Sequence, residues 1–157
     1  MNNKKTVFVE ENYNKSKKKV VLIVEADPIF TQVFSKIILK YGGSNNFSIK
    51  VSENTEEILL LAASNKIDVI LMDIALPNSI YQGKPTDGLT ITRLLKSNPK
   101  TASTPVLLTC GYSMESDGKS FLALSGADAY ISLPILDRQA FAETVAKYAF
   151  SNPEDRL

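Results

Sequence analysis

Short apolar runs alternate five times along this chain with stretches that have helical periodicity. A short apolar run bounded by polar residues is typical of a strand that is buried on both faces. Strands that alternate with helices predict a three-layer α/β fold with a parallel sheet and right-handed crossovers. The predicted strands cover residues 20–24, 47–51, 67–72, 105–109 and 129–132.

Capping residues and apolar stripes predict the helices between these runs. Asp27 before Pro28 predicts an N-cap with Pro at the first helical position, and Gly42 with Gly43 ends that helix. Apolar residues at 29, 30, 33, 34, 37 and 38 fall on one helical stripe, which we expect to face the core. The other predicted helices cover 54–64, with a capping box of Asn54 and Glu57, then 87–96, 114–125 and a stretch that begins at Asp137.

The chain divides into one core region and two short ends. Its 157 residues suit a single domain with one sizeable core. We expect residues 1–18 to form a flexible basic leader, residues 19–150 the domain, and residues 151–157 a C-terminal tail. Within the leader, residues 6–9 could instead form a short edge strand.

Composition and charge exclude several functional classes. The net charge of +1 gives no global field for nucleic acid or for a membrane surface, and the apolar runs are too short to span a bilayer. The absence of histidine excludes His-based catalytic triads and His metal sites, and the chain itself cannot be a phosphohistidine donor. A single cysteine, Cys110, fits a reducing compartment, so we expect a cytoplasmic protein.

An acid or a hydroxyl residue follows or ends three of the predicted strands: Glu25 the first, Asp73 the third and Thr109 the fourth. In an open parallel sheet, the carboxyl ends of the strands meet at the edge where ligands bind. Two carboxylates and a hydroxyl there suit Mg²⁺ near a phosphoryl group, and a carboxylate can form an acyl phosphate. The alternative is structural: Asp73 could be a cap or a loop acid, and Glu25 and Asp27 could simply favour a helix N-terminus.

Five segments of the chain, in order and in spacing, resemble the receiver domain of two-component response regulators. They are VVLIVEADP, DVILMDIALP, the Asp-Gly pair that opens the third helix, PVLLT and SGADAYISLP. The resemblance covers about residues 19–150. It implies a flavodoxin-like fold, which is a doubly wound, parallel, five-stranded sheet with the strand order 2-1-3-4-5.

The resemblance also implies roles for individual residues. Asp73 matches the aspartate that accepts the phosphoryl group, and Thr109 matches the hydroxyl residue that contacts this group. Glu25 matches the first acid of the pair that holds Mg²⁺, with Asp73 and the backbone carbonyl of Ala75 as further ligands. Tyr130 matches the aromatic residue whose rotamer follows phosphorylation. A histidine kinase or a phosphotransfer protein would supply the phosphoryl group.

Three departures from the family pattern bear on this site. Ala26 occupies the position of the second acid of the pair, and Leu133 occupies that of the lysine that pairs with the phosphoryl group. Both changes predict weak binding of Mg²⁺ and of the anion. In addition, the loop at 77–87 is longer than usual, so that Lys84 or Tyr81 could reach back over the acceptor, or the loop could be a solvent-facing insertion.

Three functions are compatible with these residues. The first is a single-domain response regulator that accepts a phosphoryl group on Asp73 and docks to a downstream protein, with no enzymatic activity beyond self-catalysed phosphoryl transfer. The second is a degenerate receiver that binds proteins independently of phosphorylation. The third is a metal-dependent phosphatase with Asp73 as nucleophile, but its second acid would stand where the chain has Ala75. We expect a monomer or a weak dimer that binds neither nucleic acid nor a membrane.

Overall fold

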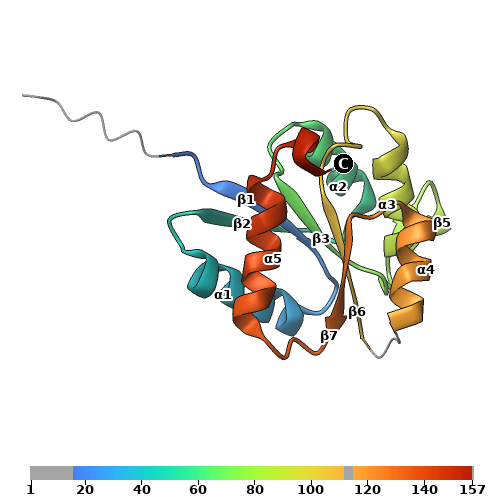
Figure 1. The fold of residues 1–157 in the computed structure, drawn as a ribbon. Coiled ribbons are helices and arrows are strands. Elements are labelled where there is room, and N and C mark those ends of the chain that lie inside the picture. The colour runs from blue at the N-terminus through green and yellow to red at the C-terminus, as the bar shows by residue number, and fades with distance from the viewer. Residues whose placement is uncertain (1–15, 112–114, 157) are drawn as a thin grey trace, which may run out of the picture.

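The computed structural model describes residues 16–111 and 115–156, and these ranges form an α/β fold around a parallel five-stranded sheet (Figure 1). The strands lie in the order β2-β1-β3-β6-β7, with neighbours paired in parallel. This order confirms the predicted sequence 2-1-3-4-5, since β6 and β7 are the fourth and fifth strands of the sheet. The strand bounds are Lys19–Val24 (β1), Phe47–Val51 (β2), Val69–Asp73 (β3), Val106–Gly111 (β6) and Ala129–Leu133 (β7).

The helices begin at the predicted caps. The Asp27 side chain accepts a hydrogen bond from the backbone N–H of Ile29 at 2.8 Å, and the Asp87 side chain accepts one from Thr90 at 2.7 Å. Such bonds satisfy N–H groups that have no partner inside the helix. The helix bounds are Pro28–Gly42 (α1), Thr55–Ala63 (α2), Gly88–Ser97 (α3), Glu115–Ser125 (α4) and Arg138–Phe150 (α5).

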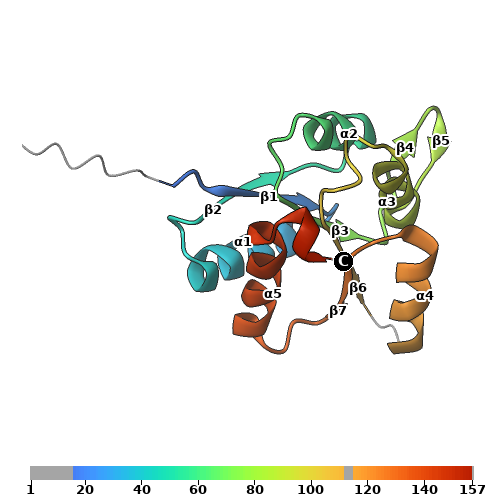
Figure 2. The same cartoon turned by 45° about the horizontal axis from the view of Figure 1, so that its top comes forward.

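The helices cover the two faces of the sheet, and each face has its own core. Figure 1 shows α1 and α5 side by side, and the turned view of Figure 2 shows α3 and α4 together on the other side of β6. The first core joins side chains of α1 and α5, such as Phe34 and Phe141, to Ile23, Leu71 and Leu107 of the sheet. The second joins side chains of α2 and α3 to the alternate residues of the same strands. The sheet is therefore buried on both faces, as the unbroken apolar runs indicate.

The predicted core stripe of α1 is only partly buried, which corrects the prediction. Phe34, Ile37 and Ile38 are buried, whereas Phe30 is 40% exposed and Val33 is 41% exposed. Phe30 continues the row of Phe34 by one helical turn, with ring centroids 5.8 Å apart. The N-terminal part of the stripe, where Ile29 is 70% exposed, therefore remains available at the surface.

The segment predicted as an irregular loop after β3 contains a small hairpin. Ile80–Tyr81 (β4) pairs antiparallel with Lys84–Pro85 (β5). The two residues between them, Gln82 and Gly83, have φ values of 50° and 76°. Positive φ at both central positions is typical of the tight turn that joins two strands with their natural twist. The sequence shows the turn formers, but each strand is too short to give a periodic signal.

The structure describes little of the predicted leader and most of the predicted C-terminal tail. The predicted leader falls almost wholly outside the described residues, as does the possible strand at 6–9. The predicted tail includes a short 3₁₀ helix, Pro153–Arg156 (η1). Within the described ranges, no helix combines the length and the apolar character that crossing a membrane requires.

Candidate functional site

The ends of β1, β3 and β6 bring the three predicted site residues to one edge of the sheet. Val24 pairs with Met72 and Asp73 pairs with Thr109, so that Glu25 directly follows β1 beside the end of β3. Side chains alternate along a strand, and Asp73 and Thr109 are two residues beyond Leu71 and Leu107. Both therefore lie on the α1 and α5 face of the sheet. The predicted placement of these residues is confirmed.

The carboxyl groups of Glu25 and Asp73 interact directly through a side-chain hydrogen bond. Glu25 is only 7% exposed, and its Oε1 accepts the backbone N–H of Asp27 at 3.0 Å. Burial raises the pKa of Glu25 to about 7, and the negative charge of Asp73 contributes in the same direction. Glu25 is therefore able to hold a proton near neutral pH.

Asp73 is half-buried at the end of β3. Its Oδ1 accepts the backbone N–H of Ala75 at 3.2 Å, which fixes the carboxylate against the turn that follows the strand. Burial raises the pKa of Asp73, although its backbone hydrogen bonds and its hydrogen bond with Glu25 oppose this effect. The carboxylate is thus held on a rigid support while part of it remains accessible.

The Thr109 hydroxyl has no hydrogen-bond partner among the residues that the structure describes. Thr109 is 1% exposed, and its Oγ1 is buried on the same face as Asp73. A buried hydroxyl without a partner is costly, and such groups often mark a place where a bound molecule completes the hydrogen bonding. The arrangement fits a hydroxyl that bonds to a group bound at Asp73.

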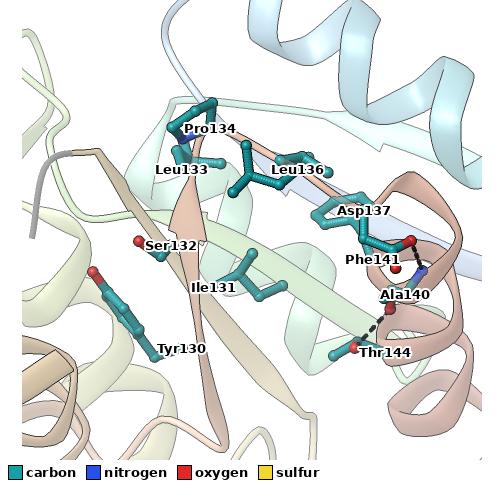
Figure 3. A pocket seen from close by; sticks show the side chains of 11 residues that line it. Tyr130, Ile131, Ser132, Leu133, Pro134, Leu136, Asp137, Ala140, Phe141 and Thr144 are labelled. Atoms are coloured by element: carbon teal, nitrogen blue, oxygen red, sulfur yellow. Dashed lines mark hydrogen bonds between the residues drawn. The ribbon is translucent and has the colours of Figure 1, made fainter.

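Tyr130 lies on the opposite side of β7 from this cluster. Figure 3 shows its ring and the side chain of Ile131 on opposite sides of the strand, as alternation requires. Its ring packs near that of Phe121, with centroids 6.2 Å apart, and burial raises the pKa of the Tyr130 hydroxyl. Gly118 of α4 leaves room for this ring, because a Cβ there would lie 2.7 Å from Tyr130 Cδ1.

Gly88 allows α3 to begin directly against the end of β3. Its N–H donates to the carbonyl of Ile74 at 3.0 Å. A Cβ on this residue would lie 2.0 Å from the backbone oxygen of Asp73, a distance that no neighbouring side-chain rotation relieves. Asp87 and Gly88 are predicted from the sequence as a helix start, but the contact of Gly88 with the end of β3 is visible only in the structure.

Gly88→Ala is expected to lower the free energy of unfolding by about 1–3 kcal/mol, because the added methyl group must push α3 away from the backbone at Asp73. Urea unfolding would measure this loss. Gly111→Ala is the matched control, since a Cβ at Gly111 meets no atom within 4 Å. Equal stability of the two variants would contradict the assignment of a packing role to Gly88.

A pocket of about 330 Å³ opens over the carboxyl pair. Its walls include two residues that the sequence analysis did not connect with the site, Phe30 and Pro134. Leu133, a predicted departure from the family, also lines it, and Figure 3 shows Leu133 and Pro134 together at the end of β7. The remaining described lining residues are Glu25, Asp27, Asp73, Ala75 and Gly111.

The hairpin of β4 and β5 does not line this pocket. Neither Tyr81 nor Lys84 is among the lining residues, Lys84 is exposed, and Figures 1 and 2 both place the hairpin beside α3. Of the two alternatives for this segment, the structure therefore shows the solvent-facing insertion.

Few side chains at this site can act as ligands to a metal ion. Among the residues in the described ranges, no group of three or more His, Cys, Asp or Glu side chains is arranged to hold a metal ion. Ala26 contributes no ligand, and Asp27 uses Oδ1 to cap α1. What remains are the carboxylates of Glu25 and Asp73, with Ala75 beside them.

The family model for the response regulator receiver domain matches residues 21–146. This chain belongs to the response regulator receiver family. The matched range includes all of the sheet except the first two residues of β1, together with the carboxyl cluster, and the receiver domain is a domain of two-component signalling. Membership also implies interaction with kinases or other signalling proteins.

Similar proteins agree with this assignment. The receiver domain is 32% identical to the polar-differentiation response regulator DivK of Brucella anthropi over 130 residues, which are 83% of this chain and 95% of that protein. Two solved structures share the fold. One is the receiver domain of a sensor histidine kinase from Pseudomonas aeruginosa, solved with a magnesium ion coordinated in its active-site cleft, with a TM-score of 0.68, 18% identity and coverage of 86% and 100%. The other is a CheY-like receiver domain protein from Methanospirillum hungatei, with a TM-score of 0.65, 19% identity and coverage of 89% and 97%.

Proposed function

We propose that Asp73 is the phosphoacceptor of this receiver domain, and that a histidine kinase or a phosphotransfer protein in the cytoplasm supplies the phosphoryl group. The observation that carries the proposal is the half-buried Asp73 carboxylate under an open pocket, beside the buried and unpartnered Thr109 hydroxyl. The product would signal by docking to a downstream protein, with the domain acting as a monomer or weak dimer.

The chemistry follows from these two side chains. A carboxylate oxygen of Asp73 attacks the phosphorus of the partner's phosphohistidine, so that a P–O bond forms and the P–N bond breaks. The electron pair of the broken bond returns to the imidazole, which takes up a proton from solvent. The Thr109 hydroxyl would donate a hydrogen bond to an oxygen of the transferred group. The rotamer of the Tyr130 side chain would change in response to this contact, so that Tyr130 acts as the switch residue. The activity of the chain itself ends with this self-catalysed transfer.

Glu25, Asp73 and the backbone carbonyl of Ala75 would hold Mg²⁺ at this site. They fit the ion in kind, because carboxylate and carbonyl oxygens are the hard donors that it takes and one or two carboxylates suffice. When bound, the ion offsets the negative charge that develops on the transferring group. The fit is a weak one, since Glu25 holds a proton near neutral pH and Ala26 adds no acid.

A degenerate receiver that binds proteins without phosphorylation is the second candidate. It is favoured by one specific observation, namely that no Lys or Arg is among the described residues that line the pocket over Asp73. A phosphoryl group that enters this pocket meets acidic side chains, and no Lys or Arg among the described lining residues offsets its negative charge.

Labelling with a small phosphodonor separates the two candidates. We expect acetyl phosphate with Mg²⁺ to phosphorylate the wild-type protein slowly and incompletely, and beryllofluoride to produce only a small response. The reason is the missing lysine, since a charge-assisted hydrogen bond is worth about 1.5–3 kcal/mol, which is roughly one to two powers of ten in rate. Intact-mass spectrometry would follow the addition of one phosphoryl group.

Asp73→Asn is the control, and this variant should show no labelling at all. Labelling that persists in Asp73→Asn would show that another residue accepts the group. No labelling of the wild-type protein, by a small donor or by a kinase, would favour the degenerate receiver.

A further inference from the structure

The pocket over Asp73 has an unbalanced charge. Three acidic residues line it, Glu25, Asp27 and Asp73, and none of its described lining residues is Lys or Arg. The sequence brings none from the adjoining segment either, because residues 112–114 are Tyr, Ser and Met. Carboxylates gathered in a partly dehydrated pocket favour a cation that comes from outside.

The walls of the pocket are apolar. Phe30, Ala75, Leu133 and Pro134 supply them, and the pocket volume of about 330 Å³ is enough for a small ligand or a side chain. A group that fits such a site combines an apolar stem with a charged end. Lysine has this shape, since its alkyl chain lies on apolar surface while its ammonium meets polar groups.

The Thr109 hydroxyl is an independent sign of a missing partner. Its Oγ1 is buried, has no hydrogen-bond partner among the described residues, and lies on the same sheet face as the Asp73 carboxylate. A hydroxyl can accept from an ammonium group or donate to a phosphoryl oxygen. The Glu25–Asp73 pair and Thr109 sit on three neighbouring strands, and an ammonium donates three hydrogen bonds in different directions.

We propose that this pocket receives a lysine side chain of the phosphodonor protein, whose ammonium lies against the Asp73 carboxylate and whose alkyl chain lies along Leu133. The partner would thus supply in trans the cation that the pocket lacks. This role rests on the proposed function, because the cation offsets the charge of the phosphoryl group that arrives with it. Free small phosphodonors bring no such cation, which makes Leu133 a specificity-determining residue that favours a protein donor.

The binding step can be tested without phosphorylation. n-Butylammonium chloride serves as the probe of a lysine side chain in a titration of the ¹⁵N-labelled wild-type protein, followed by NMR at constant ionic strength and without divalent cations. We expect saturable shifts confined to the backbone N–H groups of residues 25–27, 29, 30, 73–75, 111 and 133. Methylammonium should bind about tenfold more weakly, because it lacks three methylene groups to bury against the apolar walls.

Leu133→Lys should abolish this binding, since the introduced ammonium fills the pocket from within the chain. Leu136→Lys is the matched control: Leu136 is 92% exposed in the same connection to α5, does not line this pocket, and should leave binding unchanged. If Leu133→Lys does not fold, Asp73→Asn provides the second variant, with binding at least tenfold weaker. Shifts that spread over the surface, or equal binding by wild type and Leu133→Lys, would overturn the proposal.

A labelling experiment then separates this proposal from the function on which it rests. n-Butylammonium should accelerate labelling of the wild type by acetyl phosphate about tenfold, and should not affect Leu133→Lys. Confined binding without any labelling would support the lysine site and reject Asp73 as an acceptor. Labelling without confined binding would support the acceptor and reject the lysine site.

Discussion

Ala26→Asp combined with Leu133→Lys is expected to raise the rate of phosphorylation of Asp73 by a small donor by roughly two powers of ten or more. Ala26→Asp adds a negative oxygen ligand beside Glu25, and Leu133→Lys adds a cation in the wall of the same pocket. Each charge-assisted contact is worth about 1.5–3 kcal/mol, and 1.4 kcal/mol corresponds to a factor of ten. Because both groups act on one phosphoryl group, their effects should exceed the sum of the single changes.

Intact-mass measurements over time on the wild type, both single variants and the double variant would complete the cycle. Leu136→Lys in place of Leu133→Lys controls for the added charge, since that residue lies outside the pocket. Asp73→Asn in the double variant should remove all labelling. If the wild type already labels fully and quickly, the missing acid and the missing lysine do not limit the reaction. A folded double variant that does not label would show that another feature blocks the acceptor.

The parts of this fold that the sequence predicts are those that depend on local pattern. The strands are predicted because a sheet with two covered faces needs unbroken apolar runs, and the helix starts because Asp27, Asp87 and Asp137 bond to N–H groups two or three residues on. The site edge is also predicted, because parallel topology places the ends of neighbouring strands together. Thus the cluster of Glu25, Asp73 and Thr109 follows from topology once the strands are assigned.

The features that the sequence does not predict depend on contacts between distant elements. Phe30 belongs to the apolar stripe of α1. The helical periodicity of that stripe does not show that Phe30 lines the pocket. The sequence predicts Gly88 as part of a helix start. Its close approach to the backbone of Asp73 depends on how α3 packs against β3, and the local sequence does not show this packing. The raised pKa of Glu25 likewise depends on burial, which has no local signal in the sequence.

Glu25→Gln is expected to stabilise the protein at pH 8 by about 2–3 kcal/mol and to have little effect at pH 4. The pKa of Glu25 is about 7 in the folded protein, against an ordinary value of 4.5. Between these values the folded state retains a proton that the unfolded chain releases, so the free energy of unfolding falls as pH rises through this window. One unit of pKa difference corresponds to about 1.4 kcal/mol, so the full window gives about 3 kcal/mol.

Glutamine does not ionise, so Glu25→Gln removes the fall in the free energy of unfolding with rising pH. Its amide oxygen can still accept the N–H of Asp27, and its amide nitrogen can donate to Asp73. Urea unfolding of both proteins from pH 4 to pH 8, without Mg²⁺, would measure the difference, in which the pH dependence of groups distant from Glu25 and Asp73 cancels. Glu53→Gln, at an exposed position, is the matched control for the exchange of a carboxylate for an amide. A constant difference between wild type and Glu25→Gln across this range would mean that Glu25 ionises normally. In that case Glu25 and Asp73 would both be charged at neutral pH, and the site would bind Mg²⁺ more tightly than proposed.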